Sequence, residues 1–305
     1  MSATISVRDL RKSYGSLAAV AGVTFDVQPG EFFAILGPNG AGKTTTLEIL
    51  EGLRKADSGE VTVLGQPPWP RNPALLPRIG VQLQASSFFE RLSAREQIRT
   101  FASLYGVGAR RADEMLGVVG LTEQADVRAE KLSGGQAQRL SIACALVHDP
   151  ELVFLDEPTG ALDPQARRNL WDLLRQINAD GRTVVLTTHH MDEAETLCDR
   201  VAIMDRGAIL QAGAPATLVR GLDSPLRISV QSGLLDTAQA GTLAAQAGGG
   251  AADVSDDGVS LTIATRGPAA VLAGLAGRGA LVGLRVQGAT LEDVFLQLTG
   301  REYRA

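Results

Sequence analysis

The sequence predicts an α/β protein with a mostly parallel sheet covered by helices on both faces, followed by a small C-terminal α/β domain. Three observations support this fold class. Apolar strands alternate with helical segments along residues 1–220. A glycine-rich loop at residues 37–44 separates one such strand from a helix. Beyond about residue 220 the composition changes, and short strands with alternating apolar residues follow.

The N-terminal elements are predicted in the following order. Strands fall at residues 5–8, 23–27, 32–36, 61–64, 153–155 and 183–187. Helices run from about residue 43 to 53 and from about 164 to 179, and residues 86–148 form a mainly helical lobe. The run at 32–36 is apolar on both faces, which is typical of a central parallel strand.

The C-terminal part has its own pattern. Alternating apolar residues predict strands near 226–230, 259–263 and 282–286, and a small-residue segment at 240–252 separates the first two. A last helix is predicted with Thr290 as its N-cap, Asp293 completing a capping box, and Gly300 beyond its end. Its apolar stripe consists of Leu291, Val294, Phe295 and Leu298. We therefore divide the chain into domains of residues 1–220 and 221–305.

Composition narrows the classes of partner. The formal net charge is −5 and the arginines are scattered, which argues against a nucleic-acid partner. Cys144 and Cys198 have neither disulfide nor metal-site spacing, so reduced cysteines are expected. The most apolar segment, 268–284, is interrupted by Arg278 and several glycines, and the first residues lack a secretory core. Any membrane-spanning part is therefore expected in another chain.

The loop at residues 37–44 has the composition of a phosphate-binding loop. It reads Gly37, Pro38, Asn39, Gly40, Ala41, Gly42, Lys43 and Thr44, and Thr45 follows. Its glycines allow the backbone N–H groups to point at phosphate oxygens, and the following helix adds the positive end of its dipole. Lys43 places a charge at the β- and γ-phosphates, and the Thr44 hydroxyl can ligate Mg²⁺. The loop therefore predicts a nucleoside triphosphate site.

Two acids follow the apolar strand at 152–155. Asp156 ends the strand at the sheet edge where the phosphate loop also lies, so we expect it in the Mg²⁺ shell. Glu157 is expected to point elsewhere, because neighbours in an extended segment face opposite sides. A carboxylate beside the γ-phosphate can orient the attacking water or accept its proton.

A second glycine-rich helix start lies between the loop and the acids. Ser133, Gly134, Gly135 and Gln136 read as a capping box before an apolar helical face. Consecutive glycines weaken a helix start, so their presence favours a ligand that approaches the backbone closely. A γ-phosphate held by a second copy of the chain fits this role. ATP would then join two copies, and its hydrolysis would release them.

Together these motifs resemble the ATP-binding subunits of ATP-binding-cassette (ABC) transporters along about residues 1–220. The resemblance identifies Gly37–Thr44 as Walker A, Leu132–Gln136 as the signature motif and Leu152–Glu157 as Walker B with the catalytic glutamate. It implies a P-loop NTPase cassette with a mostly parallel core, an antiparallel β subdomain and a helical subdomain at about 86–150. It also implies ATP and Mg²⁺ as ligands.

Shorter motifs extend this resemblance. Asp163 matches the D-loop, Tyr14 the aromatic residue that stacks on adenine, and His189 the switch histidine, in preference to the adjacent His190. Gln84 matches the Q-loop glutamine, which is also a Mg²⁺ ligand in the family, and Gln82 is the competing candidate. Lys43, Glu157 and His189 are thus the expected catalytic residues.

The tail resembles a narrower group. Residues 291–301 are similar to the ending of daunorubicin-resistance-type ATPases, which pair with ABC-2-type permeases. This implies the ATPase subunit of an exporter for a drug, lipid or other compound, bound peripherally at the cytoplasmic face of the membrane. Because all motifs look intact, a homodimer is expected. An importer subunit is the alternative. ABC ATPases of DNA repair and chromosome structure carry long insertions between the motifs, so the short span between Lys43 and Ser133 disfavours them. Translation ATPases carry two cassettes in one chain, whereas this chain has one set of motifs.

Two further aromatic residues carry a separate hypothesis. Phe88 and Phe89 fall just after Gln84, where family members receive a helix of the permease. The alternative is that both belong to the core of the helical lobe.

Overall fold

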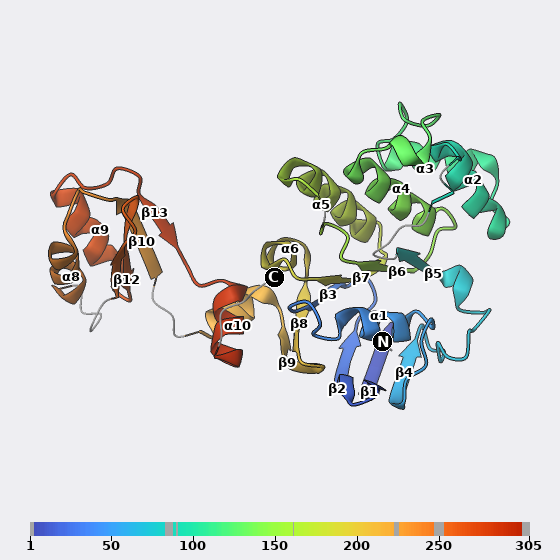
Figure 1. The fold of residues 1–305 in the computed structure, drawn as a ribbon, viewed down its shortest axis with the longest axis horizontal. Helices are drawn as coiled ribbons and strands as arrows, with labels where there is room; N and C mark the ends of the chain where they lie inside the picture. Colours follow the sequence, from blue (N-terminus) through green and yellow to red (C-terminus); the bar gives the residue numbers. More distant parts are fainter. Residues whose placement is uncertain are drawn as a thin grey trace. The chain divides into compact units, whose positions relative to one another are not determined.

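A computed structural model describes residues 3–82, 88–89, 91–160, 162–222, 226–246 and 253–300. The chain forms two compact units, the first comprising residues 1–215 and the second residues 216–302 (Figure 1). This division falls close to residue 220, where the composition changes. Among the described helices, none combines the length and the apolarity needed to cross a bilayer.

The first unit is built around a six-stranded sheet in the order β5-β6-β7-β3-β8-β9 (Figure 1). Neighbouring strands are parallel except β9, which pairs antiparallel with β8. The strands are β3 (Phe32–Leu36), β5 (Ile79–Gln82), β6 (Leu152–Asp156), β7 (Thr183–Thr188), β8 (Arg200–Asp205) and β9 (Ala208–Gly213). β3, β6 and β7 are buried along their whole length, as expected for central parallel strands.

Helices lie on both sides of this sheet. α1 (Lys43–Leu50) lies between it and a three-stranded antiparallel sheet of β1 (Ile5–Tyr14), β2 (Leu17–Val27) and β4 (Ser58–Val63). α4 (Gly134–Leu146), α5 (Pro164–Ala179) and α6 (Met191–Leu197) lie on the opposite side (Figure 1). Phe25 of β2 and Phe33 of β3 stack with ring centroids 5.3 Å apart within the core that joins the two sheets to α1. This core fixes the helix that follows the phosphate loop.

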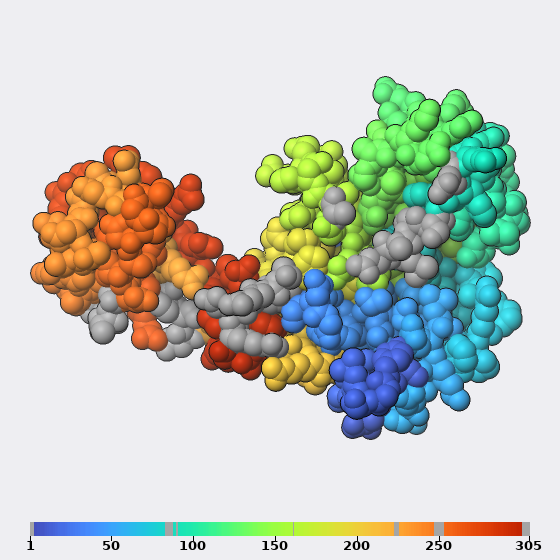
Figure 2. Space-filling model, in the orientation of Figure 1, coloured from blue at the N-terminus to red at the C-terminus, as the bar shows by residue number. Residues whose placement is uncertain are grey.

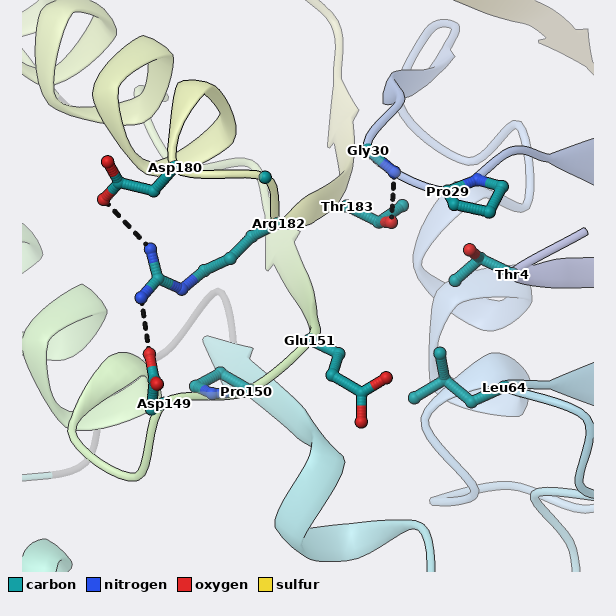
Figure 3. A pocket seen from close by; sticks show the side chains of 11 residues that line it. Thr4, Pro29, Gly30, Leu64, Asp149, Pro150, Glu151, Asp180, Arg182 and Thr183 are labelled. Atoms are coloured by element: carbon teal, nitrogen blue, oxygen red, sulfur yellow. Dashed lines mark hydrogen bonds and ion pairs between the residues drawn. The ribbon is translucent and has the colours of Figure 1, made fainter.

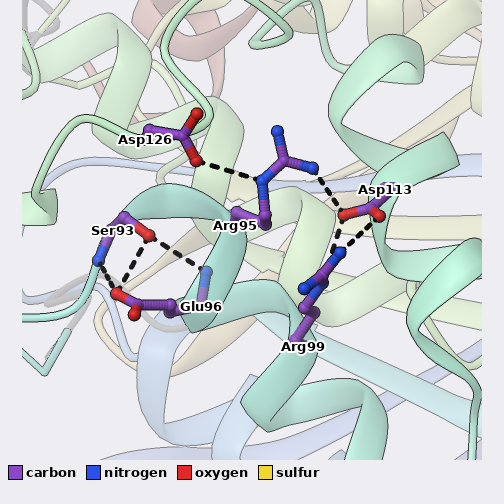
Figure 4. Close-up of polar contacts among 6 residues, drawn as sticks. All are labelled: Ser93, Arg95, Glu96, Arg99, Asp113 and Asp126. Atoms are coloured by element: carbon purple, nitrogen blue, oxygen red, sulfur yellow. Dashed lines mark hydrogen bonds and ion pairs between the residues drawn. The ribbon is translucent and has the colours of Figure 1, made fainter.

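The helical lobe consists of α2 (Ala94–Leu104), α3 (Ala109–Val118) and α4, and it lies at the opposite end of the first unit from the antiparallel sheet (Figure 2). Ser93 and Glu96 form a capping box at the start of α2. Arg95 pairs with Asp113 at 2.9 Å and with Asp126 at 3.1 Å, which ties α2 to α3 and to the following loop (Figure 4). Short 3₁₀ turns occur at Leu76–Arg78 before β5 and at Ala129–Lys131 before α4.

The second unit has a split βαβ topology. After α7 (Pro215–Arg220) come β10 (Leu226–Gln231), α8 (Thr237–Gln246), β11 (Val254–Asp256), β12 (Ser260–Thr265), α9 (Pro268–Gly277) and β13 (Arg285–Gln287). The sheet order is β11-β12-β10-β13, and all pairs are antiparallel. The core packs Ile228 and Val230 of β10 and Leu261 and Ile263 of β12 with apolar residues of α8 and α9.

Three predicted elements of the second unit can be compared with the structure. The strand predicted at 282–286 is present but shorter and displaced, because β13 covers only Arg285–Gln287, and its residues are exposed. The small-residue segment at 240–252 is partly helical, since α8 extends to Gln246. The predicted last helix is α10 (Leu291–Thr299), with the Thr290 capping box and with Gly300 in a left-handed conformation at its end.

Candidate active site

The predicted site residues emerge from neighbouring strands of the main sheet. Leu36 at the end of β3 lies beside Thr188 of β7, and Asp156 at the end of β6 lies beside Thr187 of β7. Because these strands are parallel, their carboxyl ends meet at one edge of the sheet. The phosphate loop, the two acids and the histidine pair therefore leave the sheet side by side.

The glycines of the phosphate loop meet different structural requirements. A Cβ on Gly37 would lie 2.1 Å from the Met204 carbonyl oxygen, and one on Gly42 would lie 2.1 Å from that of Ala19. Packing therefore excludes any side chain at both positions. Gly40 has a φ of 78°, and a Cβ there would meet nothing within 4 Å. Its conformation and the open space beside it suit close approach by a ligand.

Lys43 points back into its own loop. Its Nζ donates to the carbonyl oxygens of Gly37 at 2.9 Å and Pro38 at 3.2 Å, and lies 3.2 Å from Glu157 Oε1. The side chain is only 4% exposed. The ammonium is thus held inside the loop, where phosphate oxygens would be its other partners.

Asp156 and Thr44 form an oxygen-rich corner next to the loop. The Thr44 hydroxyl donates to Asp156 Oδ1 at 3.2 Å, and the Thr187 hydroxyl donates to the same oxygen. Burial raises the pKa of Asp156, while these two hydrogen bonds oppose the rise and the charge of Glu157 adds to it. A hydroxyl and a carboxylate in hydrogen-bond contact are ligands that suit Mg²⁺. The donor set therefore fits the predicted metal.

Glu157 does not follow the extended geometry that was predicted for it. Its φ is 46°, in the left-handed region, and its N–H points to the Thr187 carbonyl oxygen and hydroxyl, both at 3.1 Å. This turn directs the carboxylate to Lys43 on one side and to His189 Nδ1, at 3.2 Å, on the other. The prediction that simple strand alternation orients Glu157 is wrong, because the strand ends one residue earlier. Such left-handed strain is typical of functional positions.

His189 and Glu157 lie close together around a glycine. A Cβ built on Gly160 would lie 3.8 Å from both Glu157 Oε2 and His189 Cε1. The structure therefore brings His189, rather than His190, into contact with the acid. His190 is the N-cap residue of α6, its N–H donates to the Thr188 hydroxyl, and burial lowers the pKa of its ring.

The second glycine-rich segment forms the predicted capping box. Ser133 Oγ accepts from the Gln136 N–H at 3.3 Å, and Gln136 Oε1 accepts from the Ser133 N–H at 2.9 Å. A Cβ on Gly134 would meet nothing within 4 Å, whereas one on Gly135 would lie 3.1 Å from Ala166 Cβ of α5. Only Gly134 thus leaves the helix start open; Gly135 is needed for packing.

This helix start opens into a cavity of about 200 Å³. The cavity is lined by Ser133, Gly134, Gly135, Gln136, Arg139, Leu162, Asp163, Ala166 and Asn169. Asp163 Oδ1 caps α5 by accepting from the N–H groups of Gln165 and Ala166, each at 2.9 Å. The lining contains none of the phosphate-loop residues 37–45, all of which are described. The two predicted phosphate-binding surfaces are therefore separate within one chain.

Tyr14 lies at the end of β1 and is 42% exposed. The Arg54 guanidinium lies 5.3 Å and the Lys12 ammonium 5.7 Å from the centre of its ring. Arg54 is held in turn by Glu48 at 2.5 Å. Lys12 lies on the same strand as Tyr14, whereas Arg54 is 40 residues away in the sequence, so sequence pattern alone did not identify the Arg54 contact.

Two predicted positions lie outside the described residues. These are Gln84 and Ala161, which lies two residues before Asp163 in the D-loop segment. Gln82, the competing candidate for the Q-loop, is 1% exposed on β5 and lies beside Leu155 of β6. Thr187 is an additional site residue that the sequence reasoning missed, and its only signal was its place two residues before His189.

A second polar hollow, of about 350 Å³, lies at the amino-terminal ends of β6 and β7 (Figure 3). Arg182 there pairs with Asp149 at 2.5 Å and Asp180 at 3.1 Å, and Thr183 accepts from the Gly30 N–H. Parallel sheets bind ligands at their carboxyl ends. Because these groups at the amino ends bind one another, the hollow is no candidate for the active site.

Known proteins support the family predicted from the motifs. Residues 20–160 match the family described as ABC transporter. The chain is 39% identical over 310 residues to Nod factor export ATP-binding protein I of Cupriavidus metallidurans, covering 100% of both chains. It is 38% identical over 304 residues to the protein of the same name from Burkholderia lata, covering 98% of each.

Solved structures agree with this family. CbiO1 from Clostridium perfringens, part of an ABC transporter complex, superposes with a TM-score of 0.65 at 29% identity, covering 70% of this chain and 89% of that one. An ATP-binding subunit of another ABC transporter gives a TM-score of 0.64 at 28% identity, covering 72% and 92%. The predicted cassette fold is therefore confirmed, and the chain belongs to the ATP-binding subunits of ABC transporters, which hydrolyse ATP to power transport.

Proposed function

We propose that this chain is the ATP-hydrolysing subunit of an exporter that works with a separate ABC-2-type permease. The relatives described above are named for export, which favours an exporter over an importer. The observation that carries the proposal is the cluster of Lys43, Glu157 and His189 at the carboxyl edge of the sheet. The transported compound is determined by the permease.

The site residues divide the chemistry among them. Backbone N–H groups of residues 37–45 and the Lys43 ammonium would bind the β- and γ-phosphates of ATP. Thr44 and Asp156, together with Gln84, would hold Mg²⁺, which neutralises phosphate charge when bound. Glu157 would orient the attacking water and accept its proton, and His189 would hold Glu157 and the γ-phosphate in place. Tyr14 offers an exposed ring on which adenine can stack.

The Lys43–Glu157 pair makes the site responsive to its substrate. Without a phosphate nearby, the ammonium neutralises the carboxylate that would act as base. Phosphate oxygens compete for the same ammonium, so substrate binding would release Glu157 for the water. The base would thus become available only when ATP is in place.

A second copy would complete each site. The open Gly134 backbone and the start of α4 face a cavity that the chain's own phosphate loop does not enter. A γ-phosphate bound at Lys43 of one copy can fill this cavity in the other, since helix starts stabilise anions. Closure around ATP and opening after hydrolysis would then drive the permease between two states.

The permease is proposed to dock beside the helical lobe. Phe88, Phe89, Arg91, Leu92 and Thr100 line an apolar hollow, and Phe89 is 59% exposed. Replacing Phe89 with Ala should weaken co-purification with the permease while soluble ATPase activity stays unchanged. Leu104→Ala, which removes an exposed leucine at the end of α2, is the matched control. Equal permease recovery with both variants would remove this docking site from the proposal.

The proposed function is tested by measuring transport in membrane vesicles. The chain and a candidate ABC-2-type permease would be expressed together, and ATP-dependent accumulation of substrate in inside-out membrane vesicles would be measured. Accumulation that is lost in Glu157→Gln supports an exporter. ATP-dependent loss of preloaded substrate from the same vesicles would instead identify an importer.

A further inference from the structure

A buried carboxyl group lies directly behind the active site. Glu193 of α6 is 0% exposed, and its Oε1 accepts a hydrogen bond from Trp171 Nε1 of α5 at 3.2 Å. The hydroxyls of Thr188 and Thr159 face the same carboxyl group. In the described part of the chain, the Thr159 hydroxyl and Glu193 Oε2 are both buried without a hydrogen-bond partner.

The threonines belong to the two segments that carry the proposed catalytic pair. Thr188 is the last residue of β7 and directly precedes His189, and its carbonyl oxygen accepts from the Gly37 N–H at 3.2 Å. Thr159 follows Glu157 by two residues, and its carbonyl oxygen accepts from the Leu162 N–H at 3.1 Å. Glu193 thus lies between the segment before His189 and the segment after Glu157.

Trp171 adds a third segment to this cluster. It lies on α5, whose N-cap is Asp163, and Asp163 lines the cavity at the start of α4. The carboxyl group of Glu193 is therefore the common neighbour of three segments. These segments lead to the general base, to the histidine and to the surface that would meet the second copy.

Burying an acid at this place is costly. Loss of hydration raises the pKa of Glu193, and the charge of Asp192 adds to the rise, while the hydrogen-bonding side chains around it oppose it. An apolar residue of similar size would avoid this cost. A carboxyl group is useful here because one side chain can contact several polar groups on separate segments.

We propose that Glu193 is a positioning residue for ATP hydrolysis, which holds the Glu157 and His189 segments in register from behind the site. This inference rests on the proposed function, because it assumes that Glu157 and His189 act on the γ-phosphate. Glu193 contacts neither ATP nor the attacking water. Because the Thr159 hydroxyl faces Glu193 without a hydrogen bond to it, one can form between them when the site closes.

The test compares Glu193→Ala with Glu193→Gln in the full-length chain. Removing the side chain should lower kcat at saturating Mg²⁺-ATP on the order of 10- to 100-fold, the effect of misplacing a catalytic group. The KM for ATP should change by less than about threefold, because Lys43 and the phosphate loop are untouched. Gln keeps an oxygen for Trp171 and the same size, so it should retain most of kcat.

A second comparison separates positioning from loss of stability. Leu197→Ala removes a buried apolar side chain from the same helix but none of the polar groups that face Glu193, and it should lower Tm while preserving kcat below the melting transition. If Glu193→Ala does not fold, Trp171→Phe removes the hydrogen bond to Glu193 and Thr159→Val removes one hydroxyl that faces it. Either variant should lower kcat by a larger factor than it changes the KM for ATP.

A double variant gives the decisive readout. Adding Glu193→Ala to Glu157→Gln should cause little further loss of kcat, because a base that is absent cannot be misplaced. Three outcomes would each overturn the inference. The double variant could lose kcat by the full product of the two single losses, Glu193→Ala could keep the wild-type kcat, or Glu193→Gln could be as impaired as Glu193→Ala. These outcomes are distinct from failure of the proposed function, in which Glu157→Gln alone would keep normal turnover.

Discussion

Lys43 and Glu157 form an ion pair inside the candidate active site, with Nζ 3.2 Å from Oε1 and side chains only 4% and 11% exposed. The pair joins the helix after the phosphate loop to the turn after β6. Each partner has a second anchor, since Lys43 donates to two loop carbonyl oxygens and Glu157 lies against His189. The two proposed catalytic charges are therefore placed before ATP arrives.

Glu157→Gln should leave ATP binding intact and lower phosphate release on the order of 10²- to 10⁴-fold, the usual contribution of a positioned general base. Gln has the same size but accepts a proton poorly. Nucleotide affinity by equilibrium titration and phosphate release from the same preparation would check this prediction. Normal turnover would remove Glu157 from the role of base.

Lys43→Met should abolish measurable ATP binding. It removes the charge that meets the β- and γ-phosphates and leaves Glu157 buried without that partner. Lys55→Met, which changes an exposed lysine shortly after α1, should bind ATP as the wild type does. Isothermal titration with Mg²⁺-ATP on both variants is the measurement. ATP binding of wild-type strength by Lys43→Met would contradict the site.

Two glycine variants of the phosphate loop should behave differently. Gly42→Ala places a Cβ 2.1 Å from the Ala19 carbonyl oxygen at a φ of 102°, so it should destabilise the fold by at least about 2 kcal/mol. Gly40→Ala meets open space and should cost only about 1 kcal/mol for its positive φ, yet lower ATP affinity. Thermal melting and ATP titration separate the two effects. Equal destabilisation by both would show that the loop packs differently.

Glu51 makes the stability of the protein depend on pH. Burial, together with the charges of Asp156 and Glu48, raises the pKa of Glu51 from 4.5 to about 9. Between these values the unfolded chain has lost the proton that the folded protein keeps, so stability falls as pH rises. The loss is about 1.4 kcal/mol per pH unit.

Glu51→Gln should therefore be more stable than the wild type, with a gain that increases from pH 5 to pH 8.5. Urea unfolding of the nucleotide-free protein in EDTA would measure it. Glu60→Gln, an exposed site on β4, should show no such trend. A gain independent of pH would contradict the raised pKa.

Local signals predicted some elements with the correct bounds. The strand at 32–36 and the helix at 164–179 match β3 and α5, because an apolar run and a proline helix start are both local. The capping boxes at Ser133 and Thr290 were readable for the same reason. Walker A and Walker B could be placed at one edge because parallel strands share a direction.

Other features depend on tertiary contacts and could not be predicted. The local sequence pattern does not mark β5, β8 or β9 as strands, and β13 is shorter than the apolar alternation at 282–286 indicated. The left-handed turn at Glu157 and the burial of Glu193 depend on β7 and α5, which are distant in sequence. Motif spacing identifies the candidate catalytic residues, whereas these tertiary contacts determine how their side chains are oriented.

The central claim is that ATP is held between the phosphate loop of one copy and the start of α4 of another. The most direct measurement is the molar mass of Glu157→Gln in solution with Mg²⁺-ATP, compared with Glu157→Gln combined with Ser133→Arg. The account predicts a dimer for the first and a monomer for the second. A strict monomer for Glu157→Gln, with ATP bound and the permease present, would contradict it.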